Sequence, residues 1–154
     1  MEYIMSFLGG EFDPATLLPD LGTLLGKVEL LLRLVVLAGP VTILVLGLIY
    51  FLIPPKEANH HLGYQFFWGK SSVEAWRFTQ KLAGIVWAVL GLILAIIGLF
   101  SSSGFQGMEA MDMVWRAVKC VLWQLGLVAV SVIGIDITVV VLFNSKGQRR
   151  QFGK

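Results

Sequence analysis

Three blocks of apolar residues constrain the fold of this 154-residue chain more than any other feature. Leu34–Ile53 and Leu82–Phe100 contain no charged residue, and Cys120–Phe143 contains only Asp136. About 20 apolar residues in a helix cross a hydrocarbon core of roughly 30 Å. The helices of a soluble bundle need a polar face, which these blocks lack. We therefore predict an all-α membrane protein with three transmembrane helices.

The composition supports this prediction, and the positions of the apolar blocks divide the chain into predicted segments. Hydrophobic residues make up 56% and charged residues 14%, whereas about a quarter of residues are charged in soluble domains. The first block is too long, and begins too far from the N-terminus, for a cleaved signal peptide. The predicted segments are an N-terminal segment at 1–26, spans at 27–53, 82–100 and 119–143 within a transmembrane domain at 27–143, a loop at 54–81 and a solvated basic tail at 144–154.

Basic residues alternate in density along the chain, which predicts its orientation. Loop and tail together carry eight, and the hydrophilic segments counted as 1–27 and 101–119 carry three. The eight are Lys56, Lys70, Arg77, Lys81, Lys146, Arg149, Arg150 and Lys154, and the three are Lys27, Arg116 and Lys119. Short cytoplasmic segments carry an excess of Lys and Arg. We expect the N-terminus outside, with the loop and the C-terminus in the cytoplasm.

The loop contains a signal for the start of a helix. Ser71 and Glu74 match a capping box, in which the serine oxygen and the glutamate satisfy amides of the first turn. This predicts a short interfacial helix in the cytoplasmic loop, and no helix breaker separates it from the second span before Gly84. Trp76 is of the type that anchors a helix at the membrane boundary.

Polar residues within the spans are candidates for function. Asp136 and Gln124 lie in the third span, where an ionisable side chain is costly and often functional. Asp136 either holds the bundle together, by pairing with another helix or with water, or handles a ligand or a proton. Glu29 and Arg33 lie four residues apart and can form an ion pair. Pro40 is expected to kink the first span.

Three glycines of the second span, Gly84, Gly91 and Gly98, recur every seven residues and so lie near one side of a helix. Small residues on one side allow another helix to approach closely. That helix belongs either to this chain or to a second copy in a homo-oligomer, and the sequence does not choose between the two.

Motifs of enzymes and of cofactor-binding proteins are missing from the sequence. It has no glycine-rich phosphate loop, no G-x-S-x-G and no H-E-x-x-H. Cys120 is the one cysteine, so an internal disulfide is excluded. His60 and His61 are neighbours that diverge on a helix and need further ligands to hold a metal. We expect no enzyme activity, no cofactor, no metal site and no nucleic-acid partner.

The loop resembles the signature of the SdpI-like family of bacterial membrane proteins over residues 54–84. That signature has an Asn, a Gly-Tyr pair, then Ser, Glu and Trp, and a polar residue leading into a membrane helix. The matching residues are Asn59, Gly63, Tyr64, Ser71, Glu74, Trp76, Gln80 and Gly84. Gln65 stands where the family usually has arginine.

The resemblance implies a non-catalytic immunity or signalling protein of the bacterial plasma membrane. Its expected partners are the lipid bilayer and a toxic peptide, or a membrane or cytosolic protein. The motif residues, with Gln65, then form either a recognition loop or a packing element of the membrane domain. Two other functions stay open: an accessory subunit of a larger membrane complex, or a small oligomeric transporter that uses Asp136.

Overall fold

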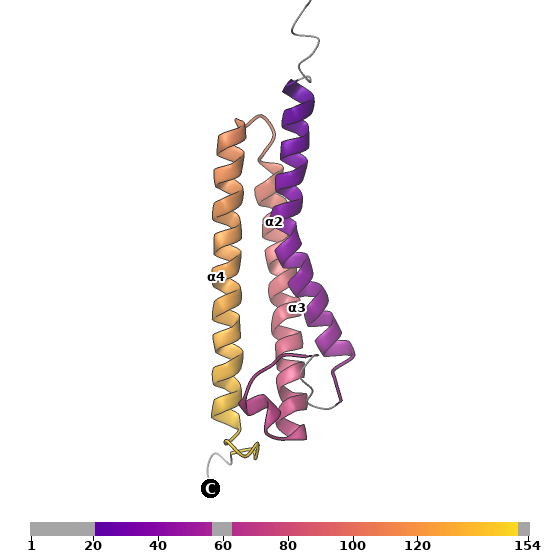
Figure 1. The fold of residues 1–154 in the computed structure, drawn as a ribbon, viewed down its shortest axis with the longest axis vertical. Helices are drawn as coiled ribbons and strands as arrows, with labels where there is room; N and C mark the ends of the chain where they lie inside the picture. Colours follow the sequence, from indigo (N-terminus) through magenta and orange to yellow (C-terminus); the bar gives the residue numbers. More distant parts are fainter. Residues whose placement is uncertain (1–20, 57–62, 151–154) are drawn as a thin grey trace, which may run out of the picture.

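Three long helices run along the long axis of the molecule in the computed structural model, which describes residues 21–56 and 63–150 (Figure 1). They are α2 (Leu21–Leu52), α3 (Val73–Ser103) and α4 (Ala110–Leu142), and a short 3-10 helix, η2 (Trp68–Lys70), precedes α3. Each long helix is long and apolar enough to cross a membrane. The predicted all-helical fold with three long apolar helices suited to spanning a membrane is confirmed. Asn59, His60 and His61 lie outside the described residues, as does the segment 1–20.

Glycines of α3 allow α2 to pack directly against its backbone. A Cβ atom added at Gly84 would lie 2.6 Å from the Phe51 nitrogen, and one added at Gly91 would lie 2.5 Å from the Leu44 nitrogen. The third glycine, Gly98, faces α2 side chains less tightly. The seven-residue glycine repeat is therefore a contact between two helices of one chain, which decides the alternative that the sequence left open.

The start of α3 differs from the predicted capping box by one residue. Ser72 is the N-cap, and its Oγ accepts a hydrogen bond from the Ala75 nitrogen at 3.0 Å. The Ser71 hydroxyl instead donates to the carbonyl of Trp68, the first residue of η2. From Val73 the helix continues unbroken to Ser103, so residues 73–81 are the first turns of α3. No separate interfacial α-helix occurs between Leu52 and Val73 in the described residues.

The described part of the tail keeps its basic residues exposed, but it folds back on the bundle at Gly147, which the prediction of a solvated tail did not include. Phe143 and Arg149 form an antiparallel bridge. Gly147, at a φ of 72°, packs against Ser72, whose hydroxyl donates to the Gly147 carbonyl at 2.7 Å. A Cβ atom at Gly147 would lie 2.5 Å from that of Ser72, so this turn needs glycine. The C-terminal turn is thereby fastened to the first turn of α3.

Candidate functional site

One α3 side chain, Gln80, holds the backbone of the loop at Tyr64. The Gln80 Oε1 accepts from the Tyr64 nitrogen at 2.7 Å, and the Gln80 Nε2 donates to the Tyr64 carbonyl at 3.0 Å. Gln80 has an exposed fraction of 0%. Buried backbone groups need hydrogen-bond partners. The amide supplies both partners at once, as a neighbouring strand would, and so fixes the loop against the bundle.

The residue before Tyr64 must be glycine for this arrangement. Gly63 has a φ of 96°, which other residues rarely adopt. A Cβ atom there would also lie 2.7 Å from the Gln80 Oε1 and 3.0 Å from the Trp76 ring. Trp76 is itself fully buried, and its Nε1 donates to the Pro55 carbonyl at 2.8 Å. The indole therefore ties the chain that leaves α2 to the first turns of α3.

The Tyr64 side chain carries the connection on to α4. Its hydroxyl donates to the Asp136 Oδ1 at 2.7 Å and lies 3.3 Å from the Val132 carbonyl oxygen. The ring packs edge-on against Trp87, with 5.4 Å between centroids, and the residue is 8% exposed. Burial and the neighbouring Asp136 carboxyl group raise the pKa of the Tyr64 hydroxyl above its usual range. The phenol therefore keeps its proton and remains the donor.

The motif residues predicted from the sequence divide into an inner and an outer set. The inner set lies together in the structure and consists of Gly63, Tyr64, Trp76 and Gln80. The Tyr64 hydroxyl joins this set to Asp136. We call these five residues the polar clamp. Of the remaining predicted site residues in the loop and the start of α3, Gln65 and Glu74 are exposed, and Ser71 contacts η2.

Gln124 forms a second, separate polar contact with α2. Pro40 has no amide hydrogen, so the Val36 carbonyl, four residues earlier, lacks its helical partner. The Gln124 Nε2 donates to that carbonyl at 3.1 Å, in a buried position. Gln124 lies about 18 Å along α4 from Asp136, at 1.5 Å per residue. Gln124 and the polar clamp are thus independent ties between helices.

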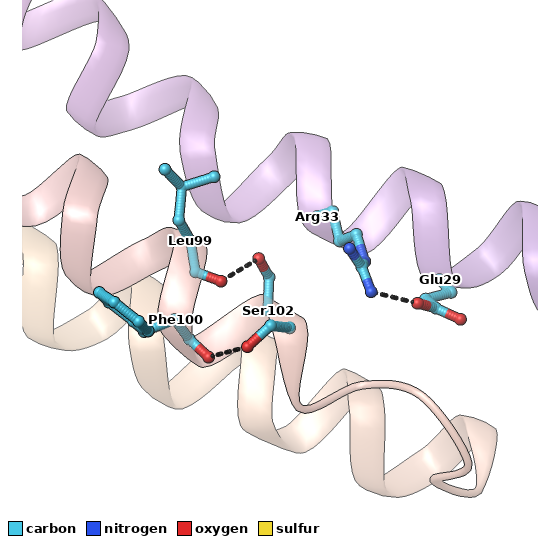
Figure 2. Close-up of polar contacts among 6 residues, drawn as sticks. Glu29, Arg33, Leu99, Phe100 and Ser102 are labelled. Carbon is cyan, nitrogen blue, oxygen red and sulfur yellow. Dashed lines mark hydrogen bonds and ion pairs between the residues drawn. The ribbon is translucent and has the colours of Figure 1, made fainter.

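The predicted pair of Glu29 and Arg33 forms at the opposite end of the molecule. Figure 2 shows Arg33 on α2 beside the end of α3, with a hydrogen bond to Glu29. The distance from the Arg33 Nη2 to the Glu29 Oε1 is 2.6 Å, and the side chains are 32% and 24% exposed. Ser102, drawn nearby, instead donates to the Leu99 carbonyl. The ion pair is therefore confirmed as a contact within α2.

Two residues of this site were not identified from the sequence. Trp87 lies in an apolar block without a polar neighbour, so nothing distinguished it from a lipid-facing residue. Pro55 contributes only a carbonyl group, which any residue supplies. As for metal binding, the described residues contain no group of three or more His, Cys, Asp or Glu that could hold an ion.

The fold and the clamp define a class: a membrane protein of three transmembrane helices whose connecting loop is pinned to the second and third helices. Residues 56–143 match the SdpI/YfhL protein family, and the chain belongs to this family. The matched region contains α3, α4 and all described residues of the polar clamp. Among curated proteins and solved structures, none matches the chain.

Proposed function

We propose that this chain is an immunity protein of the bacterial plasma membrane, which protects its host by binding a toxic peptide and performs no covalent chemistry. Membership of the SdpI/YfhL family over residues 56–143 is the observation that carries this proposal. The polar clamp supports it indirectly. The Gln80, Tyr64 and Trp76 side chains all form hydrogen bonds within the protein, so they hold the loop in place and leave recognition to their exposed neighbours.

The surface offered to a partner is the solvent-exposed side of the loop. Gln65 and Glu74 are exposed, and Phe67 is 76% exposed beside η2. An exposed aromatic ring next to polar side chains is a common anchor in protein interfaces. We place the contact with a peptide or protein partner here, while the clamp keeps this surface in position.

Survival of toxin-treated cells tests the proposal. A bacterium sensitive to a secreted peptide toxin is made to express the chain, and we expect survival to rise. Tyr64→Phe removes the hydrogen bond to Asp136, so protection should fall even where the variant reaches the membrane at the wild-type level. Immunoblots of membrane fractions measure that level.

Tyr50→Phe is the matched control. Tyr50 packs on the same Trp87 ring, at 5.9 Å between centroids, yet its hydroxyl has no hydrogen bond within the described part of the chain. Protection by Tyr50→Phe should equal that of the wild type. If the wild-type chain leaves killing unchanged for every peptide tested, the immunity function is wrong.

A transporter that uses Asp136 has less support. The Asp136 carboxyl group already accepts a hydrogen bond from the Tyr64 hydroxyl at 2.7 Å, and that partner comes from a loop pinned by Gln80. This arrangement favours a structural task for the carboxyl group. An accessory subunit would use the same clamp, and copurification with a partner chain in fixed stoichiometry would favour it over immunity.

A further inference from the structure

An open groove of about 610 Å³ lies where α2 ends and α3 begins. Three parts of the chain form its walls: the residues from Leu52 to Lys56, the first turns of α3, and the C-terminal turn around Arg149. Of the surface proposed for partner binding only Glu74 lines this groove, whereas Gln65, Phe67 and the polar clamp do not. The groove is therefore distinct from the polar clamp and borders the loop surface at Glu74.

Four basic side chains converge on the groove from these three parts. They are Lys56, Arg77, Lys81 and Arg149, and all are exposed. Glu74 is the one acidic residue in the lining. Throughout residues 21–56 and 63–150 the single salt bridge joins Glu29 to Arg33, so none of the four cations forms a salt bridge with a described acid, and they outnumber Glu74 in the lining. The groove is thus a site of concentrated positive charge that suits an anionic group.

The floor and one rim of the groove are apolar. Phe78 lines it from α3 and Phe143 from the position just after α4, and Leu52 and Ile53 form a rim at 68% and 75% exposure. The rim continues the apolar surface of α2, which faces lipid. The groove therefore offers both a place for an acyl chain and a place for a charged headgroup.

The groove lies at the level where a membrane changes from hydrocarbon to headgroups. Lys81 is the last charged residue of α3, because residues 82–103 carry no charge, and Lys56 is the first charged residue after the apolar run of α2. Arg77 and Lys81 are four residues apart, on one side of α3. Basic pockets between transmembrane helices at this level bind anionic lipid headgroups.

We propose that this groove binds an anionic phospholipid, with its phosphate among Lys56, Arg77, Lys81 and Arg149 and its acyl chains along Leu52 and Ile53. The contact between the apolar rim and the bilayer favours a lipid over a water-soluble acidic peptide, which would gain nothing from that rim. The lipid would hold the end of α2, the start of α3 and the C-terminal turn together. This inference does not depend on the immunity function.

Native mass spectrometry of the full chain in detergent provides the test. The protein is given equal amounts of phosphatidylglycerol and phosphatidylcholine with identical acyl chains, and the ratio of the two bound forms is measured. We expect the wild type to prefer phosphatidylglycerol. The double substitution Arg77→Gln with Lys81→Gln should lower that preference roughly tenfold or more. Lys56→Gln with Arg149→Gln, from the opposite walls, should do the same.

The matched control is Lys146→Gln with Arg150→Gln, which also removes one lysine and one arginine but lies outside the groove. It should keep the wild-type preference. Equal losses in all three variants would mean that net charge alone attracts the lipid, and would overturn the proposal. So would unchanged binding in both groove variants. A wild-type protein that binds a poly-glutamate peptide but shows no preference for phosphatidylglycerol would assign the groove to a protein partner instead.

Discussion

Pro40 and Gln124 show how one residue's missing hydrogen bond is supplied by another helix. A proline inside a transmembrane helix is tolerated where neighbouring groups satisfy the backbone that it leaves open. Here the open group is the Val36 carbonyl, which is buried and receives the Gln124 amide at 3.1 Å. The two residues are far apart in sequence but form one structural unit.

This unit predicts a non-additive pair of substitutions. Gln124→Leu leaves the Val36 carbonyl without a partner and should lower the free energy of unfolding by about 1–2 kcal/mol. Pro40→Ala introduces an amide that can bond to the same carbonyl, so Gln124→Leu should cost less in the Pro40→Ala background. Equilibrium unfolding in mixed micelles measures the four members of this cycle. Additive effects of the two substitutions would contradict the assignment.

The residues of the polar clamp show which part of the site the sequence could predict. Gly63, Tyr64, Trp76 and Gln80 were identified from a motif, and Asp136 from its cost in a membrane. That Tyr64 reaches Asp136 could not be foreseen, because the two are 72 positions apart and the contact depends on how the helices pack. The sequence shows which residues can form hydrogen bonds, whereas the packing of the helices determines which of these residues pair.

At the scale of elements, α2 and α3 form the close-packed pair of the molecule, and glycine makes this possible. Apolar surface alone does not drive helices together in lipid, so their association relies on direct backbone approach. At Gly91 that approach leaves no room for a methyl group, because an added Cβ atom would lie 2.5 Å from the Leu44 nitrogen and 2.7 Å from its Cα.

Gly91→Ala therefore tests the contact between α2 and α3. The methyl group must push the helices apart, and we expect a loss of about 1–3 kcal/mol in the free energy of unfolding. Gly126→Ala in α4 is the control, since a Cβ atom there meets nothing within 4 Å. It should be neutral or stabilising, because alanine favours helix by up to about 1 kcal/mol over glycine. Similar losses in both variants, measured in the same micelles, would show that the contact does not limit stability.

The elements also show where prediction from the sequence ends. Apolar blocks identify all three long helices, since a bilayer requires such blocks. The start of α3 was misassigned by one residue, because Ser71 and Ser72 are chemically equivalent and only the backbone shows which serine receives the Ala75 amide. The packing of Gly147 on Ser72 left no sequence signal either, since a glycine near a basic terminus is typical of a solvated tail.

At the scale of the whole molecule, the two ends of the bundle differ in character. One end carries the clamped loop, the C-terminal turn and the basic groove. The other carries the Glu29–Arg33 pair and the turn between α3 and α4. We propose that the basic end lies in the cytoplasm, because it holds the larger share of Lys and Arg in short segments.

Labelling of single cysteines tests this orientation. In a Cys120→Ser background, Gln106→Cys places a thiol in the turn between α3 and α4, and Lys146→Cys places one in the C-terminal turn, both at exposed positions. In intact cells, a maleimide that cannot cross membranes should label Gln106→Cys, and it should label Lys146→Cys only after lysis. The reverse labelling pattern would show that the molecule has the opposite orientation in the membrane. The groove would then face the outer leaflet, where the loop surface around Gln65 would meet an arriving toxin directly.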